Sequence, residues 1–147
     1  MQRKRFDSDA CGMARALDAV GEWWTLLIVR EAMFGAKRFE EFQRRLGISR
    51  NALTARLKRL VALGVLAREP LAEGGRREAY RLTAAGKDLS SVLIALRLWG
   101  DMHMRPEASP SRLVDAADGA PIVGLQAVRV DGRVAPAKRV VLRARDV

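Results

Sequence analysis

The chain is poor in the residues from which metal sites and covalent active sites are built. Among its 147 residues it has one histidine, His103, and one cysteine, Cys11. A single residue of each kind cannot form a zinc site, a disulfide framework or a Cys-His-Asp triad within the chain. The sequence therefore predicts neither a bound metal nor a cofactor.

Long hydrophobic runs are missing as well. The longest stretch of large apolar residues is residues 26–29, whereas a membrane span needs roughly 20 apolar residues. Three of the first five residues are basic, but no apolar segment follows them, so we expect no secretory signal. Hydrophobic residues still make up 49% of the chain, which is enough for a folded core. These features predict a soluble cytoplasmic protein that does not contact a membrane.

Acidic residues are scarce relative to basic ones, and the positive charge is concentrated in one segment. The chain has 27 Lys and Arg against 17 Asp and Glu, a net charge of +10. Residues 37–81 hold twelve basic and five acidic side chains, a net charge of +7, whereas 1–36 and 82–104 are each neutral. A solvated charged face would explain such a run, but it would not need to coincide with a structural motif. A polyanion, above all nucleic acid, is the partner that this charge favours.

Hydrophobic periodicity predicts a mainly helical fold with a small β hairpin. Apolar residues at steps of three and four indicate four helices, over residues 10–20, 24–34, 39–46 and 49–63. The pattern then changes to two short strands, 65–70 and 78–82. Ser49 is suited to cap the fourth helix, and Thr83 is suited to cap a last long helix that runs to about residue 104.

Residues 105–147 differ in composition from the rest of the chain. Four prolines and two Asp-Gly pairs interrupt this region, and they exclude a long helix. Residues 128–134 are centred on one of the Asp-Gly pairs and predict a hairpin. We therefore expect two parts: a domain over 1–104 for DNA binding and dimerisation, and a short β-rich C-terminal appendage over 105–147 of open role.

The order of elements in the first part is that of a winged helix-turn-helix, so the expected fold class is mainly α with a small β wing. Residues 39–63 would form the two-helix unit and residues 65–82 the wing. This motif lies within the segment that carries the net charge of +7. The coincidence favours a DNA-binding surface over a merely solvated face.

The expected DNA-binding side chains lie on the side of the motif that faces away from the leucines. Arg and Asn can pair with guanine and adenine edges, and such contacts come from the N-terminal part of a recognition helix. The predicted base contacts are Arg50, Asn51 and Thr54. The predicted contacts to the DNA backbone, including those of the wing, are Arg44, Arg45, Lys58, Arg59, Arg76 and Arg77. Arg56 and Arg59 flank the face, and at least one of them is expected to reach only a phosphate or to brace the fold.

Several short motifs in the right order resemble the HxlR-type winged helix-turn-helix regulators of the MarR-like superfamily. The resemblance covers about residues 9–104 and rests on Cys11, Gly21-Glu22-Trp23-Trp24-Thr25-Leu26-Leu27-Ile28, Arg38-Phe39 with Phe42, Gly47-Ile48-Ser49, Leu53-Thr54-Ala55-Arg56-Leu57, Leu60, Gly64, Tyr80-Arg81-Leu82-Thr83-Ala84-Ala85-Gly86 and Trp99-Gly100. It implies a dimeric bacterial transcription factor that binds a palindromic operator, with terminal helices at the dimer interface. Trp23 departs from the family pattern, because many relatives have a basic residue there.

The last helix of the winged domain has an apolar seam with alternating steps of four and three residues. The residues of this seam that we expect at a dimer interface are Leu89, Val92, Leu96 and Trp99. Heptad spacing suits a partner helix better than packing on the same domain, which is the alternative. The three tryptophans are interpreted as core or interface packing rather than as a ligand cage.

Cys11 allows two interpretations. A thiol near a helix N-terminus and near cations is favoured as thiolate, which suits a redox sensor. The resemblance adds to this reading, because some HxlR-type proteins sense electrophiles or oxidants through a cysteine at this position. The preferred alternative is a small buried residue facing the dimer core.

Taken together, these patterns predict a sequence-specific transcriptional regulator, expected to be a repressor. Its partners would be double-stranded DNA and a second copy of the chain, with a small molecule or an oxidant as effector. The alternative is a winged-helix interaction module that binds protein or RNA. An enzyme is not expected, because the sequence shows no constellation of nucleophile and base.

Overall fold

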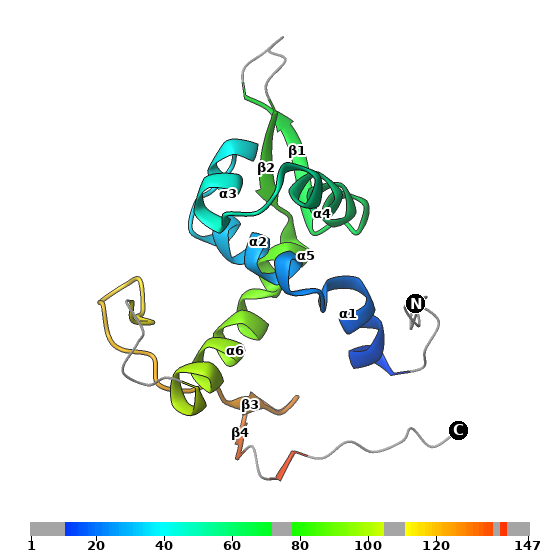
Figure 1. Cartoon of the computed structure of the whole chain (residues 1–147). Coiled ribbons are helices and arrows are strands. Elements are labelled where there is room, and N and C mark those ends of the chain that lie inside the picture. Colours follow the sequence, from blue (N-terminus) through cyan, green and yellow to red (C-terminus); the bar gives the residue numbers. More distant parts are fainter. Residues whose placement is uncertain (1–10, 72–77, 105–110, 137–138, 141–147) are drawn as a thin grey trace. The chain divides into compact units, whose positions relative to one another are not determined.

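The computed structural model describes residues 11–71, 78–104, 111–136 and 139–140. Contacts divide the chain into two units, one up to Leu93 and one from Ile94 onward. The division falls inside the last helix of the winged domain rather than after it. Figure 1 shows the elements in chain order.

The first unit contains five helices and one hairpin among its described residues. The helices are α1 (Gly12–Val20), α2 (Trp23–Met33), α3 (Phe39–Leu46), α4 (Arg50–Ala62) and α5 (Ala84–Asp88), and the hairpin is formed by β1 (Leu66–Pro70) and β2 (Glu78–Leu82). The strands are antiparallel, with Leu66 opposite Leu82 and Pro70 opposite Glu78. The predicted winged helix-turn-helix is confirmed, with boundaries within two residues for the first four helices.

The core lies where α2 meets α3, α4 and the wing. Ile28 of α2, Phe42 of α3 and Leu57 of α4 are fully buried, and Tyr80 of β2 packs edge-on against Phe42. The remaining core is continuous with them and consists of Val29, Ala36, Ile48, Leu53, Leu60, Val65 and Leu66. On α3 and α4 the buried residues are members of the apolar stripes that the three- and four-residue spacing predicts, whereas the stripe of α1 contributes no buried residue.

The turn between α3 and α4 depends on glycine. Gly47 has a φ of +64°, in the left-handed region, and its N–H donates to the carbonyl of Gln43 at 2.9 Å. A residue with a Cβ is strained in this conformation. The Ser49 hydroxyl then accepts a hydrogen bond from the N–H of Ala52 and caps α4, as predicted.

The prediction of a single long helix over residues 83–104 is wrong in one respect, because the helix is broken at Leu89. Thr83 caps a short helix, α5, through the N–H of Gly86, but this helix ends at Asp88 and α6 (Ser90–His103) begins after Leu89. Two serines follow the break, and serine side chains compete with the helical backbone for hydrogen bonds. Leu89 packs against the core of the first unit together with Leu93.

The second unit contains the end of α6 and a small β structure. The strands β3 (Ala127–Val128) and β4 (Val134–Ala135) pair around the Asp-Gly turn, which confirms the predicted hairpin. Arg97 of α6 forms an ion pair with Asp101 and donates a hydrogen bond to the carbonyl of Ser111 at 2.6 Å. The β-rich appendage is therefore fastened to α6 at its first described residue.

Candidate nucleic-acid interface

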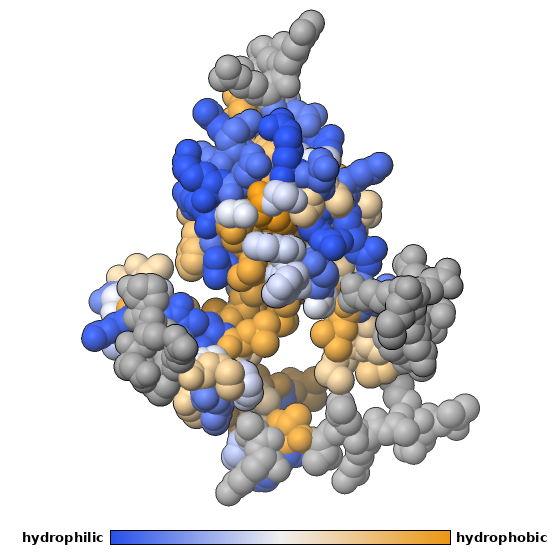
Figure 2. All heavy atoms as spheres, in the orientation of Figure 1, coloured by the Kyte–Doolittle hydropathy of each residue, from blue (hydrophilic) through white to orange (hydrophobic). Residues whose placement is uncertain are grey.

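The helix α4 presents one buried and one exposed face. Leu53, Leu57 and Leu60 are fully buried, because they face α2 and the wing. The exposed face carries all four polar residues of α4 predicted to face DNA: Arg50, Asn51, Thr54 and Lys58. In the view of Figure 2, the surface over α3, α4 and the wing is mostly hydrophilic. The structure therefore brings these four predicted residues together on one exposed face.

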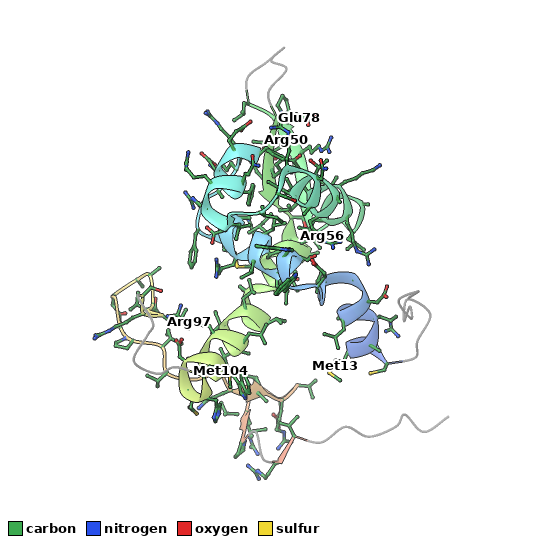
Figure 3. The ribbon with its side chains drawn as sticks, in the orientation of Figure 1. Met13, Arg50, Arg56, Glu78, Arg97 and Met104 are labelled. Carbon is green, nitrogen blue, oxygen red and sulfur yellow. The ribbon has the colours of Figure 1, made fainter. Side chains whose placement is uncertain are left out.

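Arg50 is held against an aromatic ring. Its Cζ lies 5.1 Å from the centroid of the Phe39 ring, at cation–π distance. Arg50 is the first residue of α4 and Phe39 the first residue of α3, so the turn of the motif brings them together. Figure 3 shows Arg50 at the end of α4 that lies beside the wing. Sequence reasoning missed this role of Phe39, because the contact depends on how α3 and α4 pack.

Thr54 is also partly ordered by its surroundings. Its hydroxyl donates to the carbonyl of Arg50 at 2.8 Å. The hydroxyl proton is therefore committed to the helix, and the exposed side chain keeps its methyl group and an oxygen lone pair for other contacts. Such a side chain is suited to contact a thymine methyl group or to accept a hydrogen bond from a base.

Two arginines predicted to contact the DNA backbone differ in their surroundings. Arg44 is exposed on α3. Arg45 Nη1 donates to the carbonyl of Phe34 at 3.3 Å and lies 3.7 Å from Oε2 of Glu31. Glu31 is buried and also pairs with Arg30 at 2.7 Å. Arg45 is thus partly engaged in holding α3 to the end of α2, whereas Arg44 is turned to solvent.

Arg56 and Arg59, which flank the exposed face of α4, contact other groups of the same domain. Arg59 Nη2 donates to the carbonyl of Asp18 at 2.7 Å, and its Nε donates to the carbonyl of Ala19 at 3.3 Å. Arg56 Nε lies 2.9 Å from Oε2 of Glu22. At least one of these arginines was expected to reach only a phosphate or to brace the fold. Both of them contact groups of α1 or of the α1–α2 turn.

The wing carries its own ion pairs. Arg68 lies 3.4 Å from Glu78 and stacks over Tyr80, while Arg81 pairs with Glu69. These are cross-strand pairs of the kind that stabilise a hairpin. Sequence reasoning did not assign them, although the strand register predicts them once the hairpin is aligned. Arg76 and Arg77 lie outside the described residues.

One carboxylate organises the start of α3. Oε2 of Glu41 accepts hydrogen bonds from the N–H of Lys37 at 2.7 Å and of Arg38 at 3.0 Å. These bonds, helped by the charges of Arg38 and Arg45, lower the pKa of Glu41 below its ordinary value. Glu41 is therefore a capping residue of α3 that stays ionised at neutral pH.

Cys11 and most of the apolar seam expected at the dimer interface are exposed in the single chain. Cys11 is the N-cap residue of α1 and is exposed in the single chain, so burial of its side chain would have to come from a second copy. Val92, Leu96 and Trp99 are 46%, 50% and 57% exposed. Leu89 differs from them, because it packs on the core of its own domain.

The tryptophans do not share one environment. Trp24 packs against the core, but Trp23 beside it is 71% exposed, which is more than core packing allows. Trp99 lies 5.4 Å from the ring of His103 in the last turn of α6. No group of three or more His, Cys, Asp or Glu among the described residues could hold a metal ion. None of the helices in the described part of the chain is long and apolar enough to cross a membrane.

A short turn joins α3 to α4, the second of these helices exposes a basic and amide-bearing face, and a β hairpin follows. This geometry defines a winged helix-turn-helix DNA-binding domain. Residues 19–108 match the family described as HxlR-like helix-turn-helix. The chain thus belongs to the HxlR-like family of transcriptional regulators, and the resemblance drawn from its motifs is confirmed.

Similar proteins agree with this assignment. The HTH-type transcriptional regulator MT3179 of Mycobacterium tuberculosis is 48% identical over 110 residues, which are 74% of this chain and 68% of that protein. The solved structure of PA1607, a candidate transcription factor, has a TM-score of 0.85 at 40% identity and covers 97% of this chain and 100% of its own. The quinone-bound form of YodB from Bacillus subtilis has a TM-score of 0.54 at 32% identity, with 63% of this chain and 98% of YodB covered. The likeness to PA1607 therefore extends into the C-terminal appendage.

Proposed function

We propose that this regulator binds a palindromic operator as a homodimer and represses transcription. The observation that carries the proposal is the exposed face of α4, on which Arg50, Asn51 and Thr54 lie together while the leucines of the helix are buried. This face lies within the segment of net charge +7. Its N-terminal residues are the ones that reach base edges when a recognition helix enters the major groove. A dimer bound over a promoter would repress by excluding RNA polymerase.

The apolar residues of α6 support the homodimer. Val92, Leu96 and Trp99 follow steps of four and three, so they lie on one face of the helix, and each is about half exposed. A face of this kind is stabilised when a second copy covers it in a two-fold arrangement. Two copies would present two recognition helices and would read half-sites one helical turn, or a multiple of it, apart.

Cys11 supports regulation by an oxidant or an electrophile. The thiol is exposed at the N-terminus of α1, and access is one condition for reactivity. YodB, which resembles this chain, has been solved in a quinone-bound form. With one cysteine in the chain, the chemistry would be a thiol adduct or a disulfide between two copies.

The test is selection of DNA by the full-length protein, repeated after treatment with a quinone or diamide. The selected duplex should be palindromic and should occur in the protein's own promoter region. Binding to it should exceed binding to a random duplex by about 10³-fold or more at moderate salt. Equal binding to both duplexes, or stronger binding to single-stranded RNA or to a protein, would refute the proposal. Transcription in vitro from the bound promoter should fall as protein is added, and a rise would refute repression alone.

A further inference from the structure

Arg59 of α4 caps the C-terminal end of α1. Its guanidinium donates to the carbonyls of Asp18 and Ala19, at 2.7 and 3.3 Å, and Nη2 also lies 3.8 Å from a carboxylate oxygen of Asp18. The last carbonyls of a helix have no donor within the helix, and a cation there is favoured by the helix dipole. Arg59 supplies both the donors and the charge, although it belongs to a helix 40 residues later in the chain.

Arg56 makes a second attachment one turn earlier on α4. Its Nε lies 2.9 Å from Oε2 of Glu22, and the same oxygen accepts hydrogen bonds from the N–H and hydroxyl of Thr25. Glu22 thus caps α2 and forms an ion pair with α4, although Arg56 Nε makes no hydrogen bond of good geometry. Figure 3 shows Arg56 where α4 approaches the corner between α1 and α2.

The corner itself is tight. Gly21 separates α1 from α2, and a Cβ at this position would lie 2.4 Å from the carbonyl oxygen of Leu17. The two helices therefore turn within a few residues, and the two arginines bind on both sides of the turn. We call Arg56, Arg59 and the groups that they contact the corner clamp.

We propose that Arg56 and Arg59 are positioning residues, which set the direction of the recognition helix by fastening it to the corner between α1 and α2. Arg59 is therefore not a phosphate contact, contrary to the expectation from its place beside the basic face. The proposal rests on the proposed function, in which α4 enters the major groove. To reach a phosphate, Arg59 would have to release two carbonyl hydrogen bonds, whereas the neighbouring Lys58 is exposed.

The geometry explains why such fastening matters for base recognition. Arg59 holds the C-terminal half of α4, and at 1.5 Å per residue Arg50 lies about 13 Å and Thr54 about 7 Å further along the helix. A tilt of about 5° would therefore move Arg50 by about 1 Å, which is enough to break a hydrogen bond of normal length. Loss of the clamp should reduce operator binding without removing any phosphate contact.

The experiment compares Arg59→Lys and Arg59→Ala with Lys58→Ala, by fluorescence anisotropy on the selected operator between about 50 and 200 mM salt. Lys58→Ala removes the same charge from the next residue and is the matched phosphate-contact control. Its slope of log K against log salt should fall by about 0.9 per protomer. Both Arg59 variants should lose at least about tenfold in affinity, as one mismatched base pair would cost, with the slope unchanged.

Arg59→Lys separates the two roles most sharply. Lysine keeps the charge and still binds phosphate, but it cannot span two carbonyls as the guanidinium fork does. A lysine variant that binds like wild type, or an alanine variant whose slope falls like that of Lys58→Ala, would overturn the proposal. If the alanine variant does not fold in a thermal melt, the lysine variant decides alone.

Hydrogen exchange without DNA gives an independent readout. In Arg59→Lys the backbone amides of α1 should exchange faster than in wild type, while those of Leu57 and its neighbours stay protected. Unchanged exchange in α1 would overturn the clamp even if operator binding fell. A wild-type protein that prefers no duplex refutes the proposed function instead, so the two failures are distinguishable.

Discussion

The Phe39 ring supports the guanidinium of Arg50 at the start of the recognition helix, with 5.1 Å between the cation carbon and the ring centroid. A cation over an aromatic ring contributes about 0.5–1 kcal/mol at an exposed site. The stack also restricts a long side chain that would otherwise sample many rotamers in solution. We therefore expect Phe39 to hold Arg50 in the geometry that a guanine edge requires.

Phe39→Leu removes the ring face and keeps an apolar side chain against the core, to which Phe39 also packs. With two copies in a dimer, operator binding should weaken by about 1–2 kcal/mol, roughly 5- to 30-fold. Arg50→Ala should weaken it more, because each two-pronged contact to a base is worth about 1–3 kcal/mol. Both values are measured by fluorescence anisotropy at one fixed salt concentration.

The double variant tests whether the two residues act together. If Phe39 works through Arg50, then Phe39→Leu should change binding less than about twofold once Arg50 is alanine. Phe34→Leu makes the same chemical change at an exposed phenylalanine and should leave the affinity near wild type. Losses that simply add in the double variant would refute the reasoning, as would a Phe39→Leu protein with wild-type affinity.

Three further predictions concern assembly, pH and the core. Leu96→Glu should shift the protein from dimer to monomer in sedimentation, because it places a charge on the half-exposed seam of α6. An unchanged dimer would show that this face of α6 is not the dimer interface. Glu41→Gln should lower the melting temperature most at neutral pH. Since the folded pKa of Glu41 is lowered, its stabilisation is full above its ordinary value of 4.5 and is lost as the pH falls through the folded pKa; a difference that stays constant down to pH 3 would contradict this. Leu57→Ala, at a fully buried position, should reduce the free energy of unfolding by about 2–5 kcal/mol in urea titrations, and a loss below 1 kcal/mol would show that Leu57 is not in a close-packed core.

The helices and the wing could be predicted because their signals are local. The capping serine before α4 acts within four residues, and so does the left-handed Gly47 turn. The buried leucines recur at the helical period. The break at Leu89 could not be read in the same way, because its apolar spacing continues through the junction from α5 to α6. Leu89 fits both a heptad seam and a core, and only the packing of the folded domain, where it contacts the core, decides between them.

The arginines show where sequence reasoning about the site ends. On α4, Arg50, Lys58 and Arg59 carry the same charge and lie near the same face, so the sequence assigns all three to contacts with DNA, Arg50 to bases and the other two to the backbone. Their environments differ because of groups in other helices: Phe39 of α3 lies under Arg50, while the α1 carbonyl that Arg59 binds is 41 residues away. A basic segment therefore predicts that DNA binds there, but not which of its charges reach DNA. An arginine that binds a carbonyl or carboxylate within the fold is not available to a phosphate, so the net charge of +7 overstates the number of phosphate contacts. The salt dependence of operator binding should therefore correspond to fewer contacts than the number of basic residues in the segment.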